Sequence, residues 1–320
     1  MEIKAVKFRE KGFMTRPFAL GGEDGVDKFD PNVKYRSCLQ NYLIDTGDEI
    51  ILVDTGFPAE YPGMVVDETT QIYIGSKITD YMTALKNLGY KPEQVTKILV
   101  THKHEDHTGE LRSFPNAKIY IGPEDADALN LQGENIVRAT YPDGPYHTFD
   151  ASQKIAEGVY FLPAKGHTKG NSIIVAECDG LFYMMHGDVT YTDEALYENK
   201  LSVAFEDKEA ARDTLNRVRE FIRKNPTVYC STHTPTWGSC PPLSLTLVPH
   251  TQSSSVWGER MDGWTDGRVP QSRHPKRGTR GLPGLATSTL SPRPRWGWGS
   301  VHKALHPEGR PLAAACWAGS

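Results

Sequence analysis

The chain has 320 residues, of which 38% are hydrophobic and 24% are charged, and its net charge at pH 7 is −4. This length suits one large domain or two medium domains with a buried core. The composition excludes a membrane-spanning helix, because no apolar run approaches about 18 residues, and it disfavours a secretory signal and a nucleic-acid binder.

Short apolar runs and amphipathic segments alternate through residues 1–235, which predicts an α/β fold. The first predicted strand, 50–53, leads into the turn Asp54-Thr55-Gly56. Apolar residues at helical spacing then predict a helix over residues 78–88, with Gly89 as its C-terminal cap. Further strands are predicted at 98–100, 119–121, 159–162, 172–176 and 181–185. An amphipathic helix over 211–222, stopped by Asn225-Pro226, and a last strand at 227–230 complete the series.

Residues 236–320 differ in composition from the rest of the chain. They contain all six tryptophans and no Ile, Phe, Tyr or Asn. Gly, Pro and Ser make up 31 of these 85 residues, and the net charge is +6, against −10 for residues 1–235. Such a segment buries too little apolar surface to offset the entropy of ordering it. We therefore expect a folded domain over residues 1–235 and a disordered, low-complexity tail over residues 236–320.

The cysteines indicate the compartment. The five residues are scattered and include no CxxC pair: Cys38, Cys178, Cys230, Cys240 and Cys316. An odd, scattered set does not form a disulfide framework and is typical of a reducing compartment. We expect a cytoplasmic protein that has no membrane or nucleic-acid partner. The sequence does not indicate an oligomeric state.

Seven of the eleven histidines lie between residues 102 and 233. The motif His-x-His-x-Asp-His follows the predicted strand at 98–100 and supplies His102, His104, Asp106 and His107. Imidazole and carboxylate groups together suit zinc and similar first-row metals. Three imidazoles and a carboxylate would be costly to bury side by side without a cation. The motif therefore predicts a metal site.

Three further candidate ligands each follow a predicted strand, namely His167, Asp188 and His233. Loops at strand ends converge in an α/β fold, so their wide spacing in the sequence is no obstacle to a shared site. We assign no metal role to His147 or His250. We expect His186 to point to the opposite face of its strand from Asp188.

The histidine motif, followed by Gly166-His167, Gly187-Asp188 and the late His233, resembles the metallo-β-lactamase superfamily. The Asp54-Thr55-Gly56 turn also matches, and the resemblance covers roughly residues 1–235. It implies an αββα sandwich with metals at one edge of the two sheets. The segment is most similar to N-acyl homoserine lactonases, because Tyr191 stands where these enzymes carry a tyrosine that reaches into the site. Glu105 departs from the family, which often has an apolar residue there.

The resemblance implies two zinc ions, although other divalent first-row metals suit the same ligands. It places His102, His104 and His167 on the first ion, Asp106, His107 and His233 on the second, and Asp188 between both. It also implies a metal-dependent hydrolase that opens a small-molecule ester or lactone ring, such as that of an N-acyl homoserine lactone. The attacking group would be a hydroxide that bridges the metals. Tyr191 would hydrogen bond to the carbonyl oxygen, and Asp106 would carry a proton to the leaving alkoxide.

The ligand pattern leaves other functions open. A thioesterase of the glyoxalase II type or a β-lactam hydrolase would use the same ligands, although Tyr191 favours the lactone. A metal-binding protein whose catalysis the tail has impaired is the alternative of another class. A nucleic-acid hydrolase is disfavoured by the −10 charge of residues 1–235. An apolar N-terminal patch of Phe13, Met14 and Phe18 is assigned to core packing in preference to an acyl-chain pocket.

Overall fold

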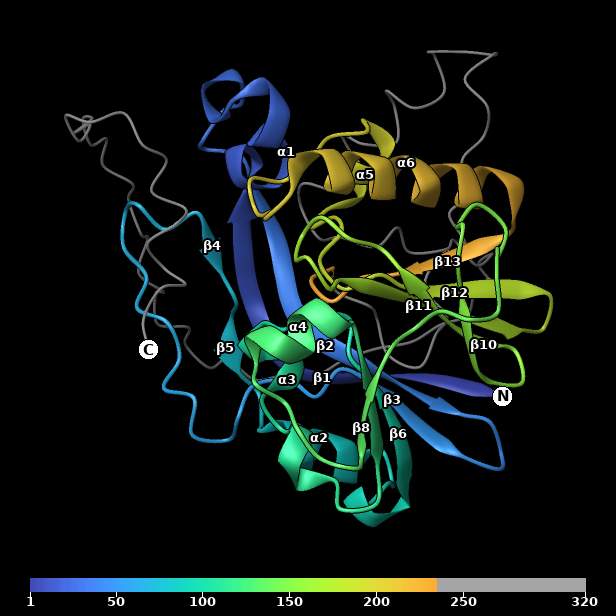
Figure 1. The fold of residues 1–320 in the computed structure, drawn as a ribbon. Helices are drawn as coiled ribbons and strands as arrows, with labels where there is room; N and C mark the ends of the chain where they lie inside the picture. The colour runs from blue at the N-terminus through green and yellow to red at the C-terminus, as the bar shows by residue number, and fades with distance from the viewer. Residues whose placement is uncertain (235–320) are drawn as a thin grey trace, which may run out of the picture. The chain divides into compact units, whose positions relative to one another are not determined.

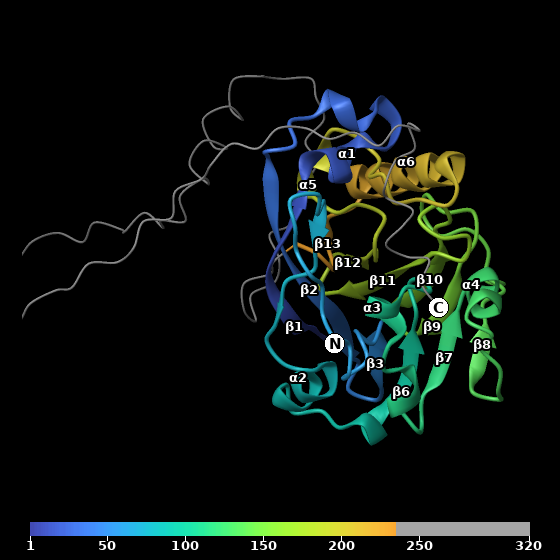
Figure 2. The ribbon, with the colours of Figure 1, turned by 90° about the vertical axis from the view of Figure 1, so that its left-hand side faces the viewer.

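The computed structural model describes residues 1–234, so the predicted tail at 236–320 lies outside the described residues. Two β-sheets pack face to face, and helices cover the outer face of each sheet (Figures 1 and 2). These four layers confirm the predicted αββα sandwich. None of the helices within residues 1–234 is long and apolar enough to cross a membrane.

The first sheet combines an N-terminal hairpin with a run of parallel strands. Its path is β4-β1-β2-β3-β6-β7-β8, and β5 also pairs with β1. The strands from β3 through β6 and β7 to β8 are parallel, so the loops that follow them leave at one edge of the sheet. The bounds are β1 (Glu2–Thr15), β2 (Lys34–Asp45), β3 (Ile50–Val53), β4 (Ile72–Tyr73), β5 (Ser76–Lys77), β6 (Val95–Leu99), β7 (Lys118–Ile121) and β8 (Ile136–Arg138).

The second sheet has the order β13-β12-β11-β10-β9. Its strands are β9 (Gln153–Ala156), β10 (Val159–Pro163), β11 (Ser172–Cys178), β12 (Leu181–Met185) and β13 (Thr227–Cys230). β10 and β12 are each antiparallel to β11, and β13 is parallel to β12. β10, β12 and β13 therefore end at the same edge, and the loops that follow them carry His167, Asp188 and His233.

The helices are α1 (Arg16–Asp24), α2 (Tyr81–Asn87), α3 (Glu105–Thr108), α4 (Pro123–Ala128), α5 (Asp193–Tyr197) and α6 (Lys208–Lys224). α6 lies across the outer face of the second sheet (Figure 1) and buries Leu215, Val218 and Ile222 there. Its first turn is capped by the side chain of Asp207, which accepts a hydrogen bond from the Ala210 N–H. Apolar side chains from the inner faces of both sheets, such as Ile51 and Ile174, form the central core.

The predicted strands and both predicted helices are present, with shifted ends. Ile78 was wrongly included in the first helix, because α2 begins only at Tyr81 and Ile78 is 49% exposed. The side chain of Asp80 caps this helix by accepting a 2.8 Å hydrogen bond from the Thr83 N–H, which fixes where the helix starts. Gly89 follows the helix with a φ of 91°, as expected for a C-terminal glycine.

The N-terminal hairpin of β1 and β2 and the helix α1 had not been predicted. Met14 and Phe18 belong to a small core cluster that includes Tyr191. Phe13 is half-buried, and its ring lies 5.9 Å from that of Tyr73. Core packing, the favoured role for this patch, is therefore what the structure shows for Met14 and Phe18.

Candidate metal centre

The histidine motif begins just after β6 ends. His102 is completely buried, and the backbone of His104 forms the N-cap of α3. Asp106 and His107 lie within α3 and are buried. The motif thus changes from an extended segment to a helix after His104.

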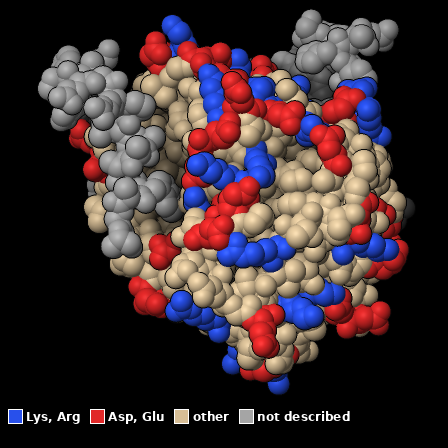
Figure 3. Space-filling model, viewed as in Figure 1, with Lys and Arg blue, Asp and Glu red and all other residues tan. Residues whose placement is uncertain are grey.

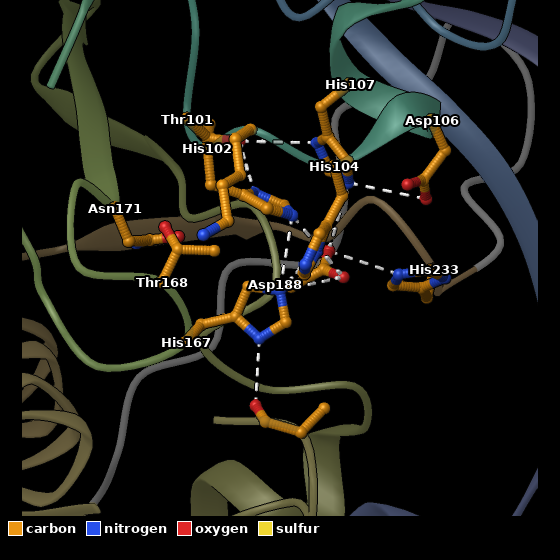
Figure 4. Close-up of polar contacts among 12 residues, drawn as sticks. Thr101, His102, His104, Asp106, His107, His167, Thr168, Asn171, Asp188 and His233 are labelled. Carbon is orange, nitrogen blue, oxygen red and sulfur yellow. Dashed lines mark hydrogen bonds and ion pairs between the residues drawn. The ribbon is translucent and has the colours of Figure 1, made fainter. Parts of the chain in front are cut away.

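The first group of side chains is His102, His104 and His167. The His167 Nε2 atom lies 3.2 Å from His102 Nε2 and 3.0 Å from His104 Nδ1. One ligand atom from each of these residues lies within 4.8 Å of the others, so the group could hold one metal ion. His167 comes from the second sheet, whereas the other two follow the first sheet, so the group spans both halves of the sandwich (Figure 4).

The second group surrounds His107. Its Nε2 atom lies 3.4 Å from an oxygen of Asp106 and 3.4 Å from Oδ1 of Asp188. His233 Nε2 lies 3.1 Å from the same Asp188 oxygen. His102 also lies close to His107 and Asp188, and these three residues could hold an ion.

Asp188 stands between the two groups (Figure 4). Its Oδ1 atom faces His107 and His233, as described above, and its Oδ2 atom faces the other side. Oδ2 lies 3.7 Å from His167 Nε2 and 4.0 Å from His102 Nε2. One carboxylate thus presents an oxygen to each group. The structure brings together all seven side chains that the sequence had nominated as ligands.

The rear nitrogens of three histidines make contacts that orient the rings. His167 Nδ1 donates to the carbonyl oxygen of Ala204 at 2.8 Å. His107 Nδ1 donates to the carboxylate of Asp54 at 2.8 Å. The hydroxyl of Thr101 donates to Asp54, so its oxygen is left to accept from His102 Nδ1 at 3.0 Å. Such contacts fix the ring tautomer and are usual for histidines that bind metals.

These contacts indicate which ring nitrogens of the histidines are free to bind a metal. Because Nδ1 is the donor in His102 and in His167, the Nε2 atom of each neutral ring carries a lone pair. Those two Nε2 atoms nevertheless lie only 3.2 Å apart. His107 Nε2 is buried and has no hydrogen-bond partner within residues 1–234. Clustered lone pairs, and a buried nitrogen that has carboxylates nearby but no hydrogen bond, are explained by cations between them, so the residues fit divalent metals.

The local electrostatics agree with this fit. Burial lowers the pKa of His102 well below its usual range, and the neighbouring histidines lower it further. Burial also lowers the pKa of His107, but the carboxylates of Asp106, Asp54 and Asp188 outweigh this effect and raise it well above its usual value. His102 therefore stays neutral, as a metal ligand must be. The group around His107 concentrates negative charge, which attracts a cation.

We expect the metal-free protein to lose stability between about pH 6.5 and pH 4. Burial and the neighbouring His167 lower the pKa of His104 to about 4, and burial lowers that of His186 to about 3. Below about pH 6.5 the unfolded chain binds protons that the folded chain excludes, at up to about 1.4 kcal/mol per pH unit for each group. Each kcal/mol lost lowers Tm by about 2–4 °C in a domain of about 150–250 residues.

The measurement is Tm of the chelator-treated protein from pH 7 to pH 5. His186→Phe should make the fall less steep, because it removes one titrating group and keeps an aromatic ring against Tyr229. A Tm that is constant over this range would contradict the expectation.

Tyr191 lies beside the second group. It is 5% exposed, and its ring centroid lies 4.8 Å from that of His233 and 6.2 Å from that of His167. Burial and the negative charge of Asp188 raise the pKa of Tyr191 well above its usual value. Its hydroxyl therefore keeps its proton. Phe18 packs edge-on against the Tyr191 ring at 5.1 Å.

Two further histidines of the described residues, His147 and His186, lie outside the candidate metal groups. His186 is fully buried and stacks on Tyr229 with the ring centroids 3.8 Å apart, and the metal groups above do not include it. His147 is exposed and lies against the rings of Phe182 and Phe221. His250 lies outside the described residues.

Sequence reasoning had missed the contacts behind the ligands. Asp54 had been noted only as part of a turn, whereas its carboxylate orients His107 and Thr101. The carbonyl of Ala204 was not identified at all. The signal available for Asp54 was its place directly after a buried strand, at the edge where the motif also begins.

Comparisons with known proteins agree on the family. A model of the metallo-beta-lactamase superfamily matches residues 40–233. An N-acyl homoserine lactonase of Bacillus cereus is 30% identical over 191 residues, which cover 57% of this chain and 76% of the relative. A solved quorum-quenching N-acyl homoserine lactone hydrolase superposes with a TM-score of 0.56 at 22% identity, over 73% of this chain and 93% of that one. Another, with the product N-hexanoyl-L-homoserine bound at its catalytic metal center, gives a TM-score of 0.55 at 22% identity, over 73% and 94% of the two chains. At this identity the solved structures support the fold alone.

Proposed function

Because this chain belongs to the metallo-beta-lactamase superfamily, we propose that it is a dinuclear metal hydrolase that opens the lactone ring of N-acyl homoserine lactones or similar cyclic esters. We assign the activity to residues 1–235. Similarity to lactonases from Bacillus supports this substrate class, and so does the place of Tyr191 beside His233.

The position of Asp188 is the observation that carries the proposal. Its two oxygens face separate groups of histidine nitrogens, at 3.1 Å for His233 and 3.7 Å for His167. A carboxylate that only balanced the charge of one protonated histidine would need only one of its two oxygens near a histidine ring. We therefore propose that Asp188 would contribute to both of two ion positions. His102, His104 and His167 would hold one ion, and Asp106, His107 and His233 would hold the other.

Zinc is the metal that we propose, because histidine and carboxylate ligands suit it. When bound, a pair of such ions supplies a hydroxide at neutral pH and polarises the substrate carbonyl. The chain's own part is to hold the ligand atoms in place. Asp54, Thr101 and the Ala204 carbonyl orient the rings from behind, so that little reorganisation is needed when substrate arrives.

Two side chains would act on the substrate directly. The Tyr191 hydroxyl keeps its proton and would donate a hydrogen bond to the carbonyl oxygen as negative charge develops there. Asp106 is buried beside His107. It would accept the proton that the attacking water loses and then pass it to the leaving alkoxide when the ring opens. The apolar cluster of Phe18 and Met14 behind Tyr191 holds its ring in position.

The alternatives differ in substrate. A thioester or a β-lactam presents the same carbonyl to the same ligands, and the lactone is favoured by Tyr191 and by the lactonase relatives. A nucleic-acid hydrolase needs basic groups that bind phosphates. On the face shown in Figure 3, acidic and basic side chains of the described residues are interspersed and form no continuous basic surface.

The test is proton release in weakly buffered solution with an N-acyl homoserine lactone, beside a thioester and a β-lactam at equal concentration. We expect acid release to be fastest with the lactone and to be abolished by removing metal with a chelator. Metal counting on the same sample completes the test. Two ions per chain with a faster thioester reaction would overturn the lactone assignment, and a folded chain that binds no ions would overturn the metal centre.

A further inference from the structure

Asp125 of α4 is a completely buried carboxylate outside the seven proposed ligands. It accepts three hydrogen bonds. Its Oδ2 atom accepts from the Lys103 N–H at 2.9 Å and from the Thr168 hydroxyl at 2.6 Å, and its Oδ1 atom accepts from the Gly170 N–H at 3.0 Å. A buried carboxylate with this many donors is a strong and directional link.

The donors to Asp125 come from two loops that belong to different sheets. Lys103 stands between His102 and His104, in the loop after β6. Thr168 and Gly170 follow His167, in the loop after β10. Asp125 therefore joins the two loops that supply the first metal group. Thr168 is seen close to His167 in Figure 4.

Two glycines show how tightly these segments pack. A Cβ atom added to Gly170 would lie 2.6 Å from the backbone nitrogen of Asp125, and one added to Gly122 would lie 2.1 Å from the Gly170 carbonyl oxygen. Neither distance leaves room for a side chain. The backbone at the start of α4 thus lies directly against the backbone of the loop that carries His167. Asp125 makes the polar contacts between these two segments.

We propose that Asp125 is a positioning residue that sets the distance between His167 and the His102–His104 pair and so tunes the affinity of the first metal position selectively. This inference rests on the proposed metal centre. We expect the second position to be affected much less, because the three hydrogen bonds of Asp125 within residues 1–234 do not involve Asp106, His107, Asp188 or His233.

The experiment measures zinc affinity one position at a time by competition with a colorimetric chelator. In a His233→Ala background only the first position is intact, and in a His104→Ala background only the second. We expect Asp125→Asn to weaken zinc binding about 10- to 100-fold in the first background, as for other contacts behind metal ligands. In the second background we expect a change of less than about 2-fold.

A control variant separates positioning from general loss of stability. Ile121 is a buried residue of β7, close to α4 in the chain, and Ile121→Val should lower Tm without changing either affinity. Thr168→Val removes one of the three hydrogen bonds by itself, and Thr168→Ser restores the hydroxyl. We expect a loss at the first position with valine and a recovery with serine.

The possible results separate this inference from the proposed function. Equal weakening of both positions, or no weakening of the first, would overturn the role of Asp125 and leave the metal centre standing. A wild-type chain that binds no zinc would overturn both. Selective weakening of the first position by Asp125→Asn and Thr168→Val, with Ile121→Val unaffected, is the supporting result.

Discussion

Replacing Asp188 with alanine is expected to remove metal from both positions and to lower kcat/KM by well over ~100-fold, the upper end of the loss for a contact behind a ligand. The reason is that Asp188 faces both groups, with His233 at 3.1 Å from one oxygen and His167 at 3.7 Å from the other. Without it, the imidazoles on each side lose the negative charge that they share.

The matched variant is His233→Ala, which removes a ligand from one side only. Bound metal, counted after gel filtration, should fall toward none with Asp188→Ala and toward one ion per chain with His233→Ala. Activity alone would not separate the two variants, because both should be nearly inactive. Two retained ions in Asp188→Ala would contradict the bridging role.

Much of the fold follows from short apolar runs that are visible in the sequence. Ile50 to Val53, in β3, is buried at nearly every position, and Ser172 to Ala176, in β11, is fully buried. Strands covered on both faces read as continuous apolar runs, which explains why these elements were predicted correctly. The long helix α6 was equally clear, because one face buries Leu215, Val218 and Ile222.

The N-terminal hairpin follows no such pattern. The register of β1 against β2 shifts between Lys7 and Arg9 and again between Arg9 and Gly12, so the alternation of apolar and polar residues is interrupted. β2 also buries Gln40 and Asn41 among its apolar residues. Neither strand therefore shows a simple period of two, and tertiary contacts decide their conformation.

The candidate ligands were visible for a different reason. Four of them stand in one short motif whose chemistry is costly to bury without a cation, and the others follow strands that end at the same edge. The contacts behind them carry no comparable signal. The Ala204 carbonyl is a backbone group that any residue would supply, and Asp125 meets Thr168 only because the two sheets pack together.

The contrast between Tyr191→Phe and His104→Ala separates the two kinds of group in the site. His104 contributes a nitrogen to the first metal group, so His104→Ala should remove the metal there and nearly all activity. Tyr191→Phe removes one hydroxyl and leaves every proposed ligand in place. The expected loss in kcat is about 10- to 1000-fold, with the upper end set by the loss of one donor to a developing oxyanion.

Metal content and the kinetic constants together decide this contrast. Tyr191→Phe should keep the wild-type number of ions and lose activity mainly in kcat, because the hydrogen bond strengthens as charge develops on the carbonyl oxygen. Phe18→Leu is the control for packing, since Phe18 touches the Tyr191 ring without carrying a hydroxyl. Equal losses of activity in Tyr191→Phe and His104→Ala, or loss of metal from Tyr191→Phe, would show that Tyr191 supports the metal centre and does not act as a donor to the substrate.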